Sequence, residues 1–528
     1  MAYPKGHMFM RLRDEVGMLL VDEDFVQLYA ARGQPGVAPW KLTLVTLMQF
    51  VENLSDRQAA DAVQGHLAWK YALSLELGDP GFDATVLSEF RTRFLRQDNL
   101  LLLLDRFLAR CQELGMLRPH GKQRTDSTHV LAAIRVMNRL ELVTETLRAA
   151  LNMLAELVPA WLKQVSDPAW YDRYAHRAET YRLPKSEAAK RAYAACVGRD
   201  GQTLLELLQQ SEAPQGALQL PEILVLQRCW ASQFLEANGA LRFKEREELS
   251  PSVEAVESPY DPEARFGTKR GQGWIGYKVH LTETCEDDLP RLLTHVTTTL
   301  GNMNDAPIGL AIQTQLFQRN LSPQQHWLDA GYNGADLIVA AREQHGTQII
   351  GPVRLNNNWS GQQVPSFDLR SFEIQWHHQQ VVCPRGQTSV TWTQTVRENG
   401  QAVINARFAK AICRACPVRA QCIRSGDHPK SLKFQPQAQQ EALYAARDAM
   451  NDPLARQLYQ RRAGIEGTIS QGVRTFGLRR CRYIGEEKTR LQHVLTAMAI
   501  NVARLDAWMT GERPIGTKPS RFARLQAA

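Results

Sequence analysis

The sequence predicts an α/β protein: a core built on a mixed sheet, with a helical region before it and two insertions inside it. A strand-like segment with an Asp near its start, residues 123–134, is followed by a long helical stretch. Strand-like and helical segments then alternate between residues 255 and 355, and a Thr/Val-rich region with four cysteines follows. This alternation of strands and helices predicts one mixed sheet, and the chain that forms it contains two insertions.

Residues 1–115 are predicted to be helical, because apolar residues recur three and four positions apart. Ser55 is the expected N-cap of one short helix, and the breaker GDPGFD precedes another, TVLSEFRTRFLR. Two interpretations stay open here. The region is a small helical bundle with solvated arginines, or a helix-turn-helix domain in which the second helix presents residues to DNA. Those residues would be Ser88, Arg91 and Arg93.

The rest of the chain divides by composition and periodicity. The core is predicted from residues 116–135, 255–355 and 432–510 together. Residues 136–254 form a helical insertion, residues 356–431 a β-rich insertion, and residues 511–528 a basic tail. Asn304 and Asp305 are expected to cap a helix within the core.

The composition is that of a globular protein, with 44% hydrophobic and 22% charged residues in 528. No apolar run approaches the roughly 20 residues of a membrane helix, and the first residues lack the apolar middle of a secretory signal. Nine cysteines in so long a chain do not form a disulfide framework. We therefore expect a cytoplasmic protein without membrane contact and with reduced thiols.

The excess positive charge is concentrated at the C-terminal end. The net charge is +8, and residues 451–528 contain fourteen Lys or Arg against six Asp or Glu. All other residues carry 49 charges of each sign. A basic region of this kind makes nucleic acid the first partner to test.

Three carboxylates stand in settings that suit catalysis. Asp126 lies in a strand pattern, where Asp is disfavoured, Asp329 ends the strand-like HWLD, and Glu466 lies in an arginine-rich helix. Converging carboxylates could hold two magnesium or manganese ions about 3.5–4 Å apart for attack on phosphodiesters. Taken singly, each acid is more simply explained as a helix cap, a turn residue or an ion-pair partner, and only the three together favour catalysis.

The helix around Glu466 carries the most specific local pattern. Tyr459, Arg462 and Glu466 are spaced by three and four, so they share one helix face. An Arg–Glu pair at this spacing can be purely structural. Further arginines nearby favour a surface that follows DNA phosphates. They are Arg461, Arg474, Arg479, Arg480 and Arg482.

Four cysteines predict a structural zinc site in the β-rich insertion. They are Cys383, Cys413, Cys416 and Cys422, in the segments CPRG and CRACPVRAQC. A CxxC pair is the usual half of a zinc site, and four thiolates leave no open position for catalysis. An iron–sulfur cluster and uncoordinated thiols remain the alternatives.

The segments TDSTHV, WLDAGYNGADL and YQRRAGIEGTISQ resemble the three acidic motifs of the DDE transposases of bacterial insertion sequences. The similarity covers nearly the whole chain and is greatest to the family known by the number eleven-eighty-two. It implies a ribonuclease-H-like core in which Asp126, Asp329 and Glu466 bind the metal ions. Tyr459 and Arg462 match the Tyr–Arg–Glu–Lys signature, but Val473 stands at the lysine position.

The resemblance also implies a reaction. Water would cut a strand at the end of the element, and the freed 3′-hydroxyl would attack target DNA, with Tyr459 as a contact and not a nucleophile. Pairing of two element ends favours a homodimer on DNA. Two other hypotheses remain: a DNA-binding protein derived from a transposase that no longer cuts, and a structure-specific nuclease.

Overall fold

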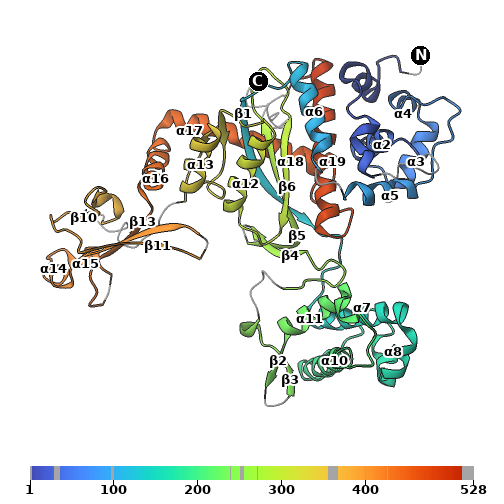
Figure 1. Cartoon of the computed structure of the whole chain (residues 1–528), viewed down its shortest axis with the longest axis horizontal. Coiled ribbons are helices and arrows are strands. Elements are labelled where there is room, and N and C mark those ends of the chain that lie inside the picture. The colour runs from blue at the N-terminus through green and yellow to red at the C-terminus, as the bar shows by residue number, and fades with distance from the viewer. Residues whose placement is uncertain are drawn as a thin grey trace, which may run out of the picture.

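The structure, a computed structural model, places its elements in several lobes around a central sheet (Figure 1). It describes residues 3–28, 36–96, 100–237, 240–249, 255–269, 271–354, 367–398, 400–424 and 426–513. Most of the predicted basic tail, residues 514–528, lies outside the described residues.

A mixed sheet forms the centre of the molecule. Its strands are β1 (Lys122–Leu131), β4 (Arg265–Lys269), β5 (Gln272–Thr284), β6 (Leu293–Leu300), β7 (Gln325–Trp327) and β8 (Gln348–Ile350). The order is β4-β5-β1-β7-β8, and β6 also pairs with β5. The strands β1, β7 and β8 are mutually parallel, whereas β5 is antiparallel to β1, β4 and β6. The predicted mixed sheet is confirmed, but β4 was missed, since its basic, Gly-containing segment was assigned to a loop.

Helices pack against this sheet. They are α12 (Asp305–Gln318), α13 (Ala335–His345), α18 (Gly464–Thr475) and α19 (Glu486–Met509). The long helix α19 runs beside β6, where Asn501 accepts a hydrogen bond from the Leu293 amide (2.7 Å) and donates one to its carbonyl (2.9 Å) (Figure 1). Because the Asn501 side chain pairs with both backbone polar groups of Leu293, it fixes the position of α19 along β6.

The N-terminal region is helical, as predicted. Its helices are α1 (Met8–Arg11), the π-helix η1 (Leu12–Val16), the 3₁₀ helix η2 (Asp22–Leu28), α2 (Pro39–Val51), α3 (Asp56–Gly65), α4 (Leu67–Ala72), α5 (Thr85–Phe94) and α6 (Leu102–Glu113). Ser55 caps α3 in a reciprocal capping box with Gln58, which confirms the predicted cap. One apolar core continues from Phe9 in this region to Leu281 in the sheet and Leu505 in α19.

A helical lobe follows β1 and carries its own apolar core. Its elements are α7 (Arg139–Leu157), α8 (Pro159–Val165), α9 (Pro168–Tyr174), α10 (Glu187–Leu207), η3 (Ala217–Gln219), α11 (Pro221–Gln233), β2 (Phe234–Ala237), β3 (Ala240–Phe243) and η4 (Arg246–Glu248). The β2–β3 hairpin departs from the helical pattern that we predicted. Phe234 begins it and packs on Trp230, whose ring occupies space left by Gly201 of α10.

The region that contains the four clustered cysteines forms a third apolar core. It comprises η6 (Leu369–Ser371), β9 (Glu373–Gln375), β10 (Gln380–Val382), β11 (Thr391–Val396), β12 (Ala402–Arg407), α14 (Lys410–Arg414), α15 (Arg419–Cys422) and β13 (Ser431–Phe434). This lobe projects to the left of the sheet in Figure 1. The chain returns through α16 (Gln437–Ala449), α17 (Pro453–Tyr459) and η7 (Gln460–Ala463).

Among the residues that the structure describes, none of the helices has the length and apolar character needed to cross a membrane.

Candidate active site

Asp126 lies in the middle of β1, in register with Leu281 of β5. The residue is only 8% exposed, and its Oδ1 accepts the Ser127 amide at 2.7 Å. Burial raises the pKa of the Asp126 carboxyl, and the charge of Asp329 adds to the rise, while the Ser127 amide and Arg462 oppose it. A buried carboxylate of this kind needs a cation nearby to remain charged.

Asp329 follows β7, the parallel neighbour of β1. Arg124 pairs with Trp327, so continuing the register by two residues places Asp329 beside Asp126. The Asp329 Oδ1 accepts the amides of Gly331 (2.8 Å) and Tyr332 (3.4 Å). These bonds hold the carboxylate at the end of the strand, where the chain turns toward α13.

Glu466 and Arg462 connect the C-terminal helices to β1. The Arg462 Nη1 donates to Asp126 Oδ2 at 2.8 Å, and its Nη2 donates to Glu466 Oε1 at 3.3 Å. Glu466 keeps 64% of its side chain exposed, whereas that of Arg462 is 17% exposed. The structure thus brings together two predicted acids, Asp126 and Glu466, around one guanidinium, with Asp329 beside them.

Tyr459 lies next to this group. Its ring centroid is 6.0 Å from the guanidinium carbon of Arg462. Burial raises the pKa of the Tyr459 hydroxyl, although Arg462 opposes the rise. The role of Tyr459 as a DNA contact residue remains a prediction.

A cavity of about 760 Å³ opens beside the carboxylates. Its lining includes Asp126 and Glu466, together with Arg474 and Arg479 of the predicted arginine surface. Arg479 is tied to β1, because its Nε donates to Thr128 Oγ1 at 2.8 Å. The cavity therefore places positive side chains within reach of anything bound at the two acids.

Lys269 also lines this cavity, from β4, and it was missed in the sequence. Its Nζ donates to the Ser127 carbonyl at 3.3 Å, immediately beside Asp126. Val473, at the signature lysine position, lines the same cavity. The only signal for Lys269 was the basic segment TKRGQGW, and no local pattern showed that this segment would pair beside β5.

The other predicted DNA-binding arginines have different surroundings. Arg461 pairs with Asp287 at 2.8 Å, and Arg480 is exposed. Arg482 donates to the Leu54 carbonyl at 3.1 Å and lies over the Phe50 ring at 4.4 Å. It therefore joins the C-terminal segment to the N-terminal helices.

On α5, the structure separates the three predicted DNA-facing residues. Arg91 is buried and makes two hydrogen bonds to Asp56, at 2.9 and 2.5 Å. Its guanidinium also lies over the Tyr483 ring at 5.1 Å. Arg91 thus faces the protein interior, while Ser88 and Arg93 lie on the exposed side of the helix.

A buried polar network behind the acids was also missed. The Tyr332 hydroxyl lies 2.5 Å from His280 Nδ1, and both side chains are buried. Burial lowers the pKa of His280 to about 4, so the imidazole is neutral. Lys278, from the same strand β5, pairs with Asp305 at 3.1 Å. The alternation of residue types along β5 was the available signal for a polar face with Lys278 and His280. It could not show which segment of the chain would pack against that face.

The four predicted zinc ligands share one cavity of about 360 Å³. Each of these cysteines is half-buried, and burial raises the pKa of the Cys422 thiol. Within the described ranges, no group of three or more His, Cys, Asp or Glu side chains is arranged closely enough to hold a metal ion. The structure therefore gathers the thiols without forming a ligand shell.

Two family models match the chain. Residues 382–506 match a transposase DDE domain, and residues 2–93 match a transposase domain known as DUF772. These matches indicate a DDE transposase of an insertion sequence. No curated protein matches the chain.

The first of these matches contains Tyr459, Arg462 and Glu466, as well as the four clustered cysteines. The second contains the capped helix α3 and all of helix α5 except its last residue, Phe94. The two family matches therefore lie toward opposite ends of the chain. Asp126, on β1, and Asp329, just after β7, lie between them in the sequence.

Proposed function

We propose that this transposase binds the ends of its insertion sequence, cleaves the DNA strands and joins the resulting 3′-hydroxyls to target DNA. The observation that carries this proposal is the bridge from Arg462 to both Asp126 and Glu466. It brings together residues from two segments far apart in the sequence. Asp329 lies beside them by the parallel register of β1 and β7.

We assign Asp126, Asp329 and Glu466 as the catalytic metal ligands. Their oxygens are the donors that magnesium or manganese prefers. The positive guanidinium of Arg462 between Asp126 and Glu466 supports this assignment, because it shares the sign of charge that a metal ion would bring. Two bound ions would activate the attacking oxygen and stabilise the leaving one. The sheet order, with β1, β7 and β8 parallel and β5 antiparallel, supports a ribonuclease-H-like core.

DNA would follow the basic cavity and the surface beside it. We assign Arg474 and Arg479, which line the cavity, to backbone phosphates of the element end. We also assign Tyr459, Arg461, Arg462 and Arg480 to the DNA-binding surface. We also keep residues 1–115 as an end-binding domain that presents Ser88 and Arg93, with Arg91 and Arg482 supporting its structure.

The remaining proposals concern organisation. Residues 136–254 and 356–431 are insertions in a core formed by 116–135, 255–355 and 432–510. Cys383, Cys413, Cys416 and Cys422 would hold a structural zinc ion in the second insertion, whose thiols already share a cavity. A cytoplasmic homodimer would pair two element ends.

The deciding experiment incubates the full-length protein with magnesium and DNA that carries the element's inverted repeats. Wild-type protein should produce nicked and joined products, and Asp126→Asn should lower the rate at least about 100-fold. Glu343→Gln, which changes an exposed carboxylate on α13, is the matched control and should cleave normally. Binding without cleavage by the wild type would favour a DNA-binding protein that no longer cuts. Equal cleavage of unrelated branched DNA would favour a structure-specific nuclease.

A further inference from the structure

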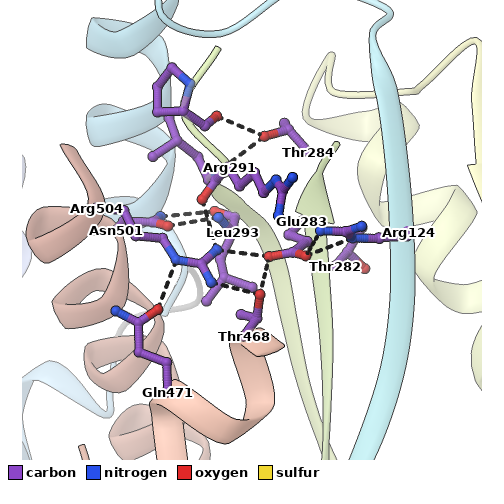
Figure 2. Close-up of polar contacts among 12 residues, drawn as sticks. Arg124, Thr282, Glu283, Thr284, Arg291, Leu293, Thr468, Gln471, Asn501 and Arg504 are labelled. Atoms are coloured by element: carbon purple, nitrogen blue, oxygen red, sulfur yellow. Dashed lines mark hydrogen bonds and ion pairs between the residues drawn. The ribbon is translucent and has the colours of Figure 1, made fainter. Parts of the chain in front are cut away.

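Glu283 is a fully buried carboxylate that joins four elements (Figure 2). Its Oε1 accepts Arg124 Nε from β1 at 2.7 Å, and its Oε2 accepts Arg504 Nη1 from α19 at 2.8 Å. The hydroxyl of Thr468, on α18, also donates to Oε2. One carboxylate on β5 therefore ties β1, α18 and α19 together.

The cluster is charged and rigid. Burial alone would raise the pKa of Glu283, but Arg504 and Arg124 outweigh it, so the pKa lies below its usual value. Arg504 makes further bonds to Thr468 (2.6 Å) and Gln471 (3.0 Å) of α18 (Figure 2). Because a buried charge without its partner is very unfavourable, these groups hold one another in place.

Arg124 connects this cluster to the candidate active site. It lies two residues before Asp126, on the same face of β1. Its Nη1 donates to the carbonyl of Arg461, the residue immediately before Arg462. Arg124 thus hydrogen-bonds to the backbone of η7, the 3₁₀ turn that contains Arg462. From this turn, Arg462 contacts Asp126 and Glu466.

The absence of a side chain at Gly464 leaves room for Arg124 to make this hydrogen bond. A Cβ on Gly464 would lie 2.0 Å from Nη1 of Arg124 and 2.4 Å from its Cζ. Arg124 is only 4% exposed and is fixed by Glu283, so it cannot move aside easily. On the same helix, a Cβ on Gly467 would meet nothing within 4 Å.

We propose that Arg124 is a positioning residue that, held by Glu283, sets the turn before α18 so that Glu466 lies opposite Asp126. This inference rests on the proposed function, because it concerns the same carboxylates. Arg124 is not among the residues that line the cavity beside Asp126 and Glu466. It acts through the Arg461 carbonyl and through the close approach at Gly464.

The test compares Gly464→Ala with Gly467→Ala in the full-length protein. Both replacements are the same chemical change within the first turn of one helix. Manganese binding without DNA is measured by electron paramagnetic resonance, alongside cleavage turnover, the KM for element-end DNA and the Tm. Gly464→Ala should weaken manganese binding about tenfold and lower turnover about 100-fold, with KM nearly unchanged and only a small fall in Tm, because the start of α18 would shift away from the fixed Arg124. Gly467→Ala should match the wild type in manganese binding, turnover and KM, with an equal or slightly higher Tm.

A second comparison isolates Arg124. In an Arg124→Ala background the space beside Gly464 is empty, so adding Gly464→Ala should cause no further loss of manganese binding. Full manganese binding and turnover in Gly464→Ala would overturn the positioning role. A parallel fall in Tm, DNA affinity and manganese affinity would overturn it too, since that pattern marks a general structural defect. A wild type that neither binds manganese nor cleaves would overturn the proposed function as well.

Discussion

Arg462 and Asp126, 336 positions apart in the sequence, are joined by a 2.8 Å hydrogen bond from Nη1 to Oδ2. The second nitrogen of the same guanidinium reaches Glu466 at 3.3 Å. The two nitrogens of this planar, forked cation each contact a different carboxylate. Arg462 therefore joins β1 to α18 at the point where the proposed chemistry takes place.

Replacing Arg462 with lysine tests this bridge. A lysine ammonium can pair with Asp126 or with Glu466, but it cannot present two nitrogens in a fixed fork. Loss of one charge-assisted hydrogen bond costs about 1.5–3 kcal/mol, so cleavage should fall roughly 10- to 100-fold. The rate is measured on element-end DNA, with Arg456→Lys on α17 as the control. Wild-type cleavage by Arg462→Lys would rule out a need for the bridge.

Arg474 and Arg482 should separate DNA binding from stability. Arg474 is exposed in the cavity, so Arg474→Ala should weaken DNA binding and reduce the slope of log affinity against log salt by about 0.9. Arg482 is used internally, so Arg482→Ala should lower the free energy of unfolding by about 1–3 kcal/mol and leave the slope unchanged. Binding titrations at several salt concentrations and denaturant unfolding measure both. The reverse pattern would show that we have exchanged their roles.

The Asp56–Arg91 pair should make the stability of the N-terminal helices depend on pH. Burial alone would raise the pKa of Asp56, but hydrogen bonds from Arg91 and Gln49 outweigh it, and the pKa lies below its usual value. A lowered folded-state pKa means that the pair stabilises the fold above the unfolded pKa of about 4 and ceases to do so as pH falls through the folded value. Asp56→Asn should cost about 2 kcal/mol at pH 7 and less at low pH.

Unfolding of Asp56→Asn is followed by circular dichroism between pH 3 and pH 7. Asp61→Asn, an exposed position on the same helix, serves as the control and should leave stability nearly unchanged. A cost that is independent of pH would contradict the assignment of this pair.

The cysteine cluster predicts one zinc ion per chain. Cys416→Ser should abolish zinc retention and make the lobe between residues 367 and 434 more sensitive to proteolysis, because four ligands complete a structural site. Cys196→Ser changes a half-buried thiol in the helical lobe and should keep the metal. The zinc content of the purified protein is measured by atomic emission. If wild-type protein that is purified in the presence of zinc contains no bound zinc, the proposed site is wrong.

Local patterns in the sequence predicted much of the fold. The alternation along β1, β5 and β6 showed strands, and Ser55 before DRQAADAV showed a cap, because period and capping are local properties of the backbone. Strand β4 and the β2–β3 hairpin escaped prediction. Their short segments lack a clear period, and their pairing depends on neighbours that the local pattern does not specify.

The candidate site shows the same division. The sequence by itself determined which acids and arginines exist, how Tyr459, Arg462 and Glu466 are spaced, and where the positive charge collects. Only the tertiary structure decided which arginines face the cavity: Arg474 and Arg479 do, whereas Arg91 and Arg482 are bonded within the protein. Only the tertiary structure placed Lys269 beside Asp126. It also placed Glu283 between Arg124 and Arg504. The physical reason is that an arginine's surroundings are set by which distant carboxylate or carbonyl satisfies its donors, and those partners meet only when the sheet and helices have packed.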